Sequence, residues 1–448
     1  MFMDNLKNKI QNSAKWKEII SSIENGEGYF SEKSLKLSKL KEMFINCFMN
    51  TIETTFEFME DNTAFIITGD IPAMWLRDST AQVRHYIPFL REVPDLKEAV
   101  KGLIKRQIYY INLDPYANAF NKEPNAHGHS DDITEASPWV WERKYEVDSL
   151  CYPIQLAYLY WKETGESDIF DDSFKKAVCS IIDLWTLEQR HQELSSYRFE
   201  RINCPESDTL KNNGMSTPVN YTGMTWSGFR PSDDACVFGY LIPANMFAVV
   251  VLGYMEEIFG CVYTETEVAA KVAELKEKIN KGIQDYGIIE HPKYGKMYAY
   301  ETDGFGNHLL MDDANVPSLL SIPYLNYETP DTSIYMNTRN FLLSKSNPYY
   351  FDGEFARGVG SPHTSNGYVW HIALIMQGLT ASDKKEVSDI LVMLTTTDSD
   401  STYMHESFNP NNPSEFSRAW FAWANSLFAE FIYHLNEKNE IFKAHLMN

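Results

Sequence analysis

Helical segments that alternate with long polar loops are the feature that most constrains the fold of this chain. Apolar residues recur at helical spacing in successive stretches, and strand-like runs such as Phe65-Ile66-Ile67 are short and few. The predicted helices cover two or three segments within 4–57, then about 83–90, 96–111, 152–164, 170–194, 241–259, 266–286, 368–379, 387–396 and 416–435. Roughly a dozen helices of similar length predict an all-α fold, a closed ring of helical hairpins with the site-building loops at one end.

Two local signals predict where helices begin. Asp78 or Ser79 is a natural N-cap for the helix that contains Val83, and Val316-Pro317 is typical of a helix start. No Gly/Ser- or Pro-rich linker, low-complexity segment or visible repeat interrupts the sequence. We therefore expect a single domain over residues 1–448, although the length alone would allow two or three.

The charge of the chain limits its partners. The formal net charge is -22, and no run of Lys or Arg interrupts the acidic balance. Such a surface repels polyphosphates, which argues against nucleic acid and anionic membranes as partners and leaves a neutral glycan compatible. Aromatic residues make up 14% of the chain, and although most will serve the core, aromatic rings also stack on the C–H faces of sugars.

Cysteine usage and the N-terminal sequence point to a cytoplasmic protein. The six cysteines are scattered without a C-x-x-C pair, which is typical of free thiols in a reducing compartment. The first residues lead into polar, helix-like sequence rather than an apolar signal segment. The longest apolar run, Leu241 to Met255, contains Pro243 and Asn245 and is too short to span a bilayer, so it predicts a buried helix.

The stretch from Gly69 to Val83 contains a tryptophan, Trp75, followed closely by the adjacent pair Arg77 and Asp78. Two interpretations of that pair stay open from spacing alone. The first is a buried ion pair that ties a loop down. The second is a sugar grip, because guanidinium donates hydrogen bonds, carboxylate accepts them, and a vicinal diol can do both.

The other long loops have the same composition of tryptophan, arginine and paired carboxylates. Glycoside hydrolysis needs two carboxyl groups on opposite sides of a bond, one protonated and one ionised. Spacing alone does not select the pair from its candidates, which are Asp148, Asp233, Asp234, Asp312, Asp313 and Glu406. The sequence has no nucleophile elbow, phosphate-binding loop or dinucleotide fingerprint.

One short segment has the composition of a metal site. His127-Gly128-His129 with Asp131-Asp132 could converge on an ion. Hydrogen bonding within the loop or to a sugar explains the same residues, and we favour it over metal ligation.

Five blocks of this sequence resemble glycoside hydrolase family 125, the bacterial and fungal exo-α-1,6-mannosidases. They lie in the expected order and span residues about 65 to 410, most of the chain. The blocks are Gly69-Asp70-Ile71-Pro72-Ala73-Met74-Trp75-Leu76-Arg77-Asp78-Ser79, Trp141-Glu142-Arg143-Lys144-Tyr145-Glu146-Val147-Asp148-Ser149-Leu150, Phe229-Arg230-Pro231-Ser232-Asp233-Asp234, Asp312-Asp313-Ala314-Asn315-Val316-Pro317-Ser318-Leu319-Leu320 and His405-Glu406-Ser407-Phe408.

The resemblance implies an (α/α)6 barrel and an inverting exo-α-1,6-mannosidase without a metal or cofactor. Carried over by motif, Asp233 is the general acid and Glu406 the general base, with the adjacent Asp234 as the alternative acid. The acid is then expected to have a pKa raised by burial and nearby negative charge, and to stand about 6.5–9.5 Å from the base. The substrate is expected to be an α-1,6-mannose-terminated, N-glycan-type oligosaccharide. The expected substrate-binding residues are Trp75, Arg77, Asp78, Arg230, Asp313, Asn315 and His363.

Three alternative functions stay compatible with the residues. Another (α/α)6 exo-glycosidase, of the glucosidase type, shares the Trp-x-Arg-Asp chemistry. A sugar epimerase on the same barrel would use a pair of histidines to deprotonate a carbon, and His363 and His371 are candidates. A binding-only sugar receptor would result if one of the two carboxylates were out of place.

Overall fold

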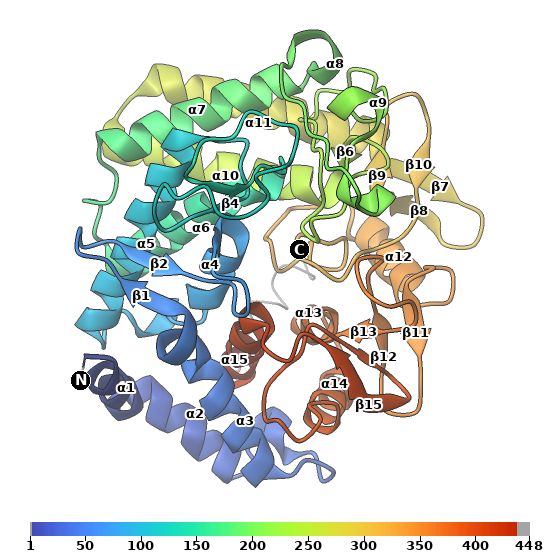
Figure 1. Cartoon of the computed structure of the whole chain (residues 1–448). Helices are drawn as coiled ribbons and strands as arrows, with labels where there is room; N and C mark the ends of the chain where they lie inside the picture. The colour runs from blue at the N-terminus through green and yellow to red at the C-terminus, as the bar shows by residue number, and fades with distance from the viewer. Residues whose placement is uncertain (1, 437–448) are drawn as a thin grey trace.

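A ring of helices surrounds a central site in the computed structural model, which describes residues 2–436 (Figure 1). The inner helices pack against one another, α4 (Leu76–Arg84) against α6 (Val147–Thr164) and α15 (Ala422–Asn436), α6 against α10 (Ile242–Ile258), and α13 (His371–Leu379) against α15. The outer helices are α3 (Leu37–Asn50), α5 (Pro94–Leu113), α7 (Asp172–Glu188), α11 (Thr266–Tyr286), α12 (Thr332–Leu342) and α14 (Lys384–Thr396). Inner and outer helices alternate along the chain, which confirms the predicted ring of helical hairpins.

The remaining helices are short or lie at the N-terminal edge of the ring. They are α1 (Phe2–Asn12), α2 (Ala14–Glu24), α8 (His191–Leu194) and α9 (Lys211–Gly214). Residue 1 and residues 437–448 lie outside the described part of the chain, so the single-domain prediction for residues 1–448 stays a prediction.

Small antiparallel sheets cover the ends of the inner helices and carry the loops of the site. The three-stranded sheets are β3 (Met74–Trp75), β4 (Ala119–Phe120) and β5 (Val140–Glu142); β10 (His308–Leu309), β9 (Glu301–Thr302) and β6 (Tyr240–Leu241); and β13 (Val369–Trp370), β14 (Ser407–Asn409) and β15 (Asn412–Ser417). The hairpins are β1 (Phe56–Phe58) with β2 (Ala64–Ile66), β7 (Ile288–His291) with β8 (Gly295–Tyr298), and β11 (Tyr350–Asp352) with β12 (Arg357–Val359). Because β3, β6 and β13 run directly into α4, α10 and α13, each three-stranded sheet fixes the N-terminal end of an inner helix.

One inner position of the ring holds irregular chain instead of a helix. The helix predicted to begin at Val316-Pro317 is absent, and the buried segment 311–325, between α11 and α12, has no regular helix. It packs among the inner helices, since Tyr152 of α6 donates a hydrogen bond to the Val316 carbonyl (2.7 Å). The Asp312 carboxylate accepts the N–H groups of Leu319 and Leu320 at 2.9 and 3.0 Å. These tertiary bonds fix a conformation that the local helix-start signal does not show.

Other helix boundaries also differ from the predictions. Of the helix predicted over about 83–90, only residues 83 and 84 lie in α4, and Ile87–Phe89 forms a 3-10 turn. Helix α4 begins at Leu76, with Trp75 as its N-cap, so Asp78 and Ser79 lie inside its first turns. The predicted helix over 170–194 is divided into α7 and α8, and the last helix begins at Ala422, since residue 416 lies in β15. Early entry into α4 turns the Arg77 and Asp78 side chains into the ring, where both are buried.

The ring is closed by a buried ion pair between helices that are far apart in the sequence. Arg84 of α4 lies 3.0 Å from the Glu430 carboxylate of α15 and stacks over the Tyr324 ring at 4.0 Å. Tyr324, in the irregular inner segment, donates a hydrogen bond to the same carboxylate at 3.0 Å. The contacts therefore join the first inner helix, the last inner helix and the irregular segment at one point.

Within the described residues, one helical span, Ile242–Tyr263, is long and apolar enough to cross a membrane by length and composition. In the structure its first part, α10, packs against α6 and α11 within the ring. That placement agrees with the prediction of a buried helix over this apolar run.

Candidate active site

A pocket of about 370 Å³, its open mouth included, lies where the loops and the inner helix ends converge. Its walls come from distant parts of the chain, namely residues 68–78, 231–233, 315, 363–370 and 406–423. Of the residues predicted for the site, the pocket is lined by Trp75, Arg77, Asp78, Asp233, Asn315, His363 and Glu406. Arg230 and Asp313 do not line it.

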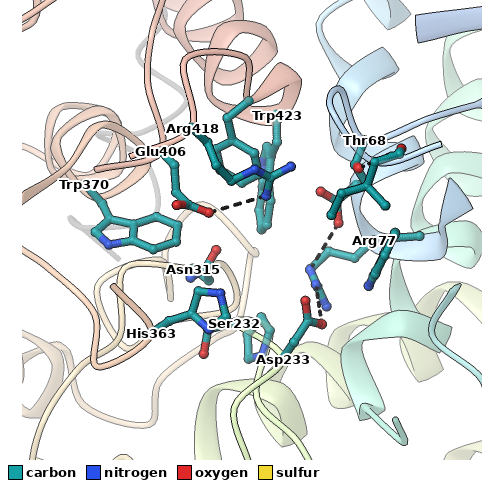
Figure 2. A pocket seen from close by; sticks show the side chains of 15 residues that line it. Thr68, Arg77, Ser232, Asp233, Asn315, His363, Trp370, Glu406, Arg418 and Trp423 are labelled. Atoms are coloured by element: carbon teal, nitrogen blue, oxygen red, sulfur yellow. Dashed lines mark hydrogen bonds and ion pairs between the residues drawn. The ribbon is translucent and has the colours of Figure 1, made fainter. Parts of the chain in front are cut away.

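Glu406 immediately precedes β14 and stands on one side of the pocket (Figure 2). Ser417 Oγ donates a hydrogen bond to its Oε2 at 2.8 Å, and Arg418 Nη1 lies 3.4 Å from its Oε1. The backbone before it is fixed as well, because the His405 N–H donates to Nδ1 of the buried His371 at 2.9 Å. Both carboxylate oxygens are therefore oriented by neighbours on adjacent strands and loops.

Asp233 stands on the opposite side of the pocket from Glu406 (Figure 2). It occupies a tight turn in which the Asp233 N–H donates to the Arg230 carbonyl at 2.9 Å and the Arg230 N–H donates to the Asp234 carbonyl at 2.8 Å. The φ of Asp233 is 67°, in the left-handed region that costs a non-glycine residue free energy and that clusters at functional sites. Lys144 Nζ supports the turn by donating to the Asp233 carbonyl at 2.7 Å.

The structure gives the two adjacent aspartates different surroundings. Asp233 lines the pocket, whereas Asp234 points behind the wall, where its Oδ1 lies 3.1 Å from His363 Nδ1. Burial alone would lower the pKa of His363, but Asp234, Asp233 and Glu406 together raise it to about 9. A protonated His363 therefore lies among these carboxylates, and Asp233 has the access that a group acting on a ligand needs.

Arg77 is the centre of a buried cluster of four carboxyl groups. Its Nη1 pairs with Glu146, its Nη2 lies 3.1 Å from Asp233, and Asp78 and Asp148 lie 3.5 and 3.6 Å away. The pair is buried, as the ion-pair interpretation expects, and it also lines the pocket, so the sugar-grip interpretation stays a prediction.

The pKa of Asp233 differs from the prediction. Burial alone would raise it, but Arg77, a hydrogen bond from Glu146, Lys144 and His363 together lower the pKa of Asp233 well below its ordinary value. Burial and the charge of Asp233 instead raise the pKa of Glu146 well above the usual range. The expectation of a raised pKa on Asp233 is thus wrong, because the sequence does not show that Arg77 and Lys144 contact this aspartate.

Arg230 and Asp313 lie behind the pocket wall and support residues that line it. Arg230 Nε lies 2.6 Å from buried Glu301, and Arg230 also closes the turn that carries Asp233. The Asp313 carboxylate accepts a hydrogen bond from the hydroxyl of Ser232, a lining residue, at 2.8 Å.

Several lining residues were not predicted from the sequence. They are Thr68, Ile71, Pro231, Ser232, Trp370, Arg418, Phe421 and Trp423. Arg418 sits over the Phe421 ring at 4.8 Å and close to Trp423 in the chain, so an arginine beside a run of aromatic residues was the signal available in the sequence. Trp370 immediately precedes α13 as Trp75 precedes α4, a correspondence that becomes visible only with the helix boundaries.

A ring of helical hairpins with facing carboxylates in an aromatic-lined pocket defines the chain as a glycoside hydrolase with the (α/α)6 fold. Structures with this architecture include a glycosidase (TM-score 0.53, 10% identity, covering 89% of this chain and 98% of that one). A second is the glucoamylase from Saccharomycopsis fibuligera (TM-score 0.55, 12% identity, 95% and 97% coverage). At such low identity these two likenesses show the fold alone.

The sequence profile of the metal-independent α-mannosidases (GH125) matches residues 38–433, and the chain belongs to this family. A Streptococcus pneumoniae protein, described as one of the metal-independent α-mannosidases and solved in a non-productive complex with α-1,6-mannobiose, is 46% identical. The two structures superpose with a TM-score of 0.90 and cover 96% of this chain and 99% of that one. The meiotically up-regulated gene 157 protein of Schizosaccharomyces pombe is 38% identical over 439 residues, or 93% of this chain and 85% of that protein.

Proposed function

We propose that this α-mannosidase is an inverting exo-enzyme that releases terminal, non-reducing α-1,6-linked mannose from N-glycan-type oligosaccharides. The observation that carries the proposal is the placement of Asp233 and Glu406 on opposite sides of one pocket. Inverting hydrolysis needs this arrangement, because the acid works on the leaving oxygen while the base activates a water on the opposite face of the sugar ring.

Each residue then has a defined task. Asp233 donates a proton to the glycosidic oxygen, and the C1–O bond breaks with its electron pair on the leaving group. Glu406, oriented by Ser417 and Arg418, takes a proton from the water that adds to C1. The product is mannose with the opposite anomeric configuration.

The exo-action rests on the depth of the pocket. Arg77 and Asp78 line it and are only 3% and 5% exposed, so they form a floor on which the far hydroxyl groups of a terminal sugar can rest. Trp75, Trp370 and Trp423 supply ring faces for the sugar C–H groups. A floor of this kind leaves room for a chain end but not for an internal sugar unit.

The linkage and the sugar are supported by the Streptococcus pneumoniae relative, whose structure contains α-1,6-mannobiose. The epimerase alternative loses one of its two histidines, because His371 is fully buried outside the pocket lining and its pKa is lowered to about 3 by burial.

A comparison of substrates tests this proposal. The protein is incubated with α-1,6-mannobiose, α-1,2- and α-1,3-mannobiose, and an α-1,6-mannotriose whose non-reducing end is blocked by methylation. We expect cleavage of the free α-1,6-linked disaccharide and none of the end-blocked trisaccharide. Cleavage of the blocked trisaccharide would contradict exo-action, and preference for another linkage would contradict the specificity.

A further inference from the structure

The position of Glu146 is not explained by the roles assigned so far. Glu146 is the last residue before α6, is 1% exposed and does not line the pocket. Yet Arg77 and the side-chain amide of Asn118 each contact both Glu146 and Asp233. A second carboxyl group held beside the proposed acid, and hidden from substrate, is a candidate for a role in handling its proton.

The contacts of Glu146 tie it to Asp233 and supply it with hydrogen-bond donors. Asn118 Nδ2 lies 3.3 Å from Glu146 Oε1 and 3.3 Å from Asp233 Oδ1, so a single amide holds both carboxyl groups together. Glu146 Oε2 is paired with Arg77 and accepts a hydrogen bond from Ser149 Oγ at 2.7 Å. These donors are suited to stabilise Glu146 when it becomes ionised.

The local charge requires at least one proton among these carboxyl groups. Arg77 is one cation facing four carboxyl groups, and two carboxylates that share one amide and one guanidinium in a largely buried cluster cannot both ionise readily. Lys144 and His363 are the other cations beside these carboxyl groups, and each has an anionic partner of its own. Lys144 is paired with Asp208, and His363 is paired with Asp234. The charged groups that face the Glu146–Asp233 pair are Arg77 and Asp78 from α4, Asp148 from α6, and Lys144 and His363 from the loops.

We propose that Glu146 is the proton-sharing partner of Asp233, a positioning residue that keeps one proton on the pair at neutral pH and passes it to Asp233 for catalysis. The inference rests on the proposed function. Transfer of the proton from Glu146 to Asp233 leaves Glu146 as a carboxylate held by Arg77, Ser149 and Asn118. The raised pKa of Glu146 beside the lowered pKa of Asp233 agrees with a proton that rests on Glu146 before it is passed on.

The reaction then balances without any other reactant. Asp233 gives the proton to the glycosidic oxygen, and the leaving group departs as an alcohol. Water adds to C1 and gives its second proton to Glu406. After product release Glu406 returns that proton to solvent, and the Glu146–Asp233 pair takes one up, so only water is consumed.

The decisive variant is Glu146→Gln, measured with two substrates. Mannobiose has a poor leaving group that needs the proton, whereas 2,4-dinitrophenyl α-mannoside has a leaving group that departs without one. We expect Glu146→Gln to lower kcat/KM for α-1,6-mannobiose at pH 7 by roughly 100-fold. The kcat/KM for the aryl mannoside should change by less than about threefold. Asp233→Asn should show the same selective loss.

Glu142→Gln is the matched control. Glu142 is 4% exposed and accepts from the same Asn118 amide at 2.9 Å, but it is anchored by Arg201 rather than by Asp233. We expect it to leave the ratio of the two substrates as in the unaltered enzyme. Equal losses on both substrates in Glu146→Gln, or undiminished cleavage of mannobiose, would overturn the inference. An unaltered enzyme that cleaves neither substrate would contradict the proposed function instead.

The pH profile of the unaltered enzyme gives a second test that needs no variant. With mannobiose, kcat/KM should fall at high pH as the pair loses its single proton, and the aryl mannoside should show no such limb. We expect this limb well above the ordinary range of a lone carboxyl group, because burial and the neighbouring carboxylates raise the pKa of Glu146. A limb at or below about pH 4, the ordinary range of a lone aspartate, would overturn the inference even if Glu146→Gln fails to fold.

Discussion

Replacement of Glu430 by Gln should cost the fold several kcal/mol, because Glu430 joins α15 to α4. Burial alone would raise its pKa, but Arg84 and His434 and the hydrogen bond from Tyr324 together lower it from its ordinary value of 4.5 to about 2. A pKa lower by about 2.5 corresponds to about 3 kcal/mol in favour of the ionised form in the folded state. Since the variant also leaves Arg84 buried without its anionic partner, we expect the free energy of unfolding to fall by about 3–5 kcal/mol.

Urea denaturation of the unaltered protein and of Glu430→Gln at several pH values measures this cost. The folded-state pKa is the depressed one, so the contribution is fully present above about pH 4.5 and is lost as the pH falls toward 2. The difference between the two proteins should therefore be constant from pH 5 to 7 and shrink below pH 4. Asp389→Asn, which breaks the exposed Lys385–Asp389 pair, is the control and should cost less than about 1 kcal/mol. A cost of that small size for Glu430→Gln would refute the role of this ion pair in closing the ring.

Three further changes have defined outcomes. Glu406→Gln should lower kcat on α-1,6-mannobiose by roughly 10²- to 10⁴-fold while calorimetry still detects sugar binding, and loss of binding alone would argue against its role as base. His363→Asn should remove a contribution to stability that is present below about pH 6.5 and is lost as the pH rises through 9. The difference in melting temperature between the two proteins should therefore shrink across that range, and a constant difference would contradict this role. Gly69→Ala should lower the free energy of unfolding, measured in urea, by more than about 1 kcal/mol. Gly69 has a φ of 132°, and an added Cβ would lie 2.8 Å from the Trp420 carbonyl oxygen. An unchanged urea midpoint would show that the two loops can separate.

Most of the helical ring could be predicted from hydrophobic periodicity. Helix α11 has the bounds that its apolar pattern gives, and α5, α6 and α10 differ from theirs only near the ends. The irregular segment 311–325 could not be predicted, because Asp312 binds the backbone N–H groups of Leu319 and Leu320 and overrides a local helix-start signal. Hydrophobic periodicity indicates which face of a segment is buried, but it does not indicate which backbone N–H groups will donate hydrogen bonds to a side chain.

The motifs in the sequence select residues that line one pocket, whereas the contacts among those residues could not be predicted and their roles stay predictions. The residues carried over from the motifs include both carboxyl groups that now face each other across the pocket. Glu146 was not singled out, because it matters through Asp233, which is distant in the sequence. Arg418 was not singled out although it lies near Glu406 in the sequence, because the contact between them depends on the fold. The direction of the Asp233 pKa was wrong for the same reason, since Arg77 is 156 residues away along the chain.

The anomeric form of the first product tests the central proposal most directly. Proton NMR of α-1,6-mannobiose hydrolysis, recorded before mutarotation, distinguishes the α- and β-anomers of the released mannose. If Asp233 and Glu406 act as acid and base on opposite faces of the sugar, β-mannose should accumulate first. Initial α-mannose would show retention and would contradict the mechanism proposed for this pair.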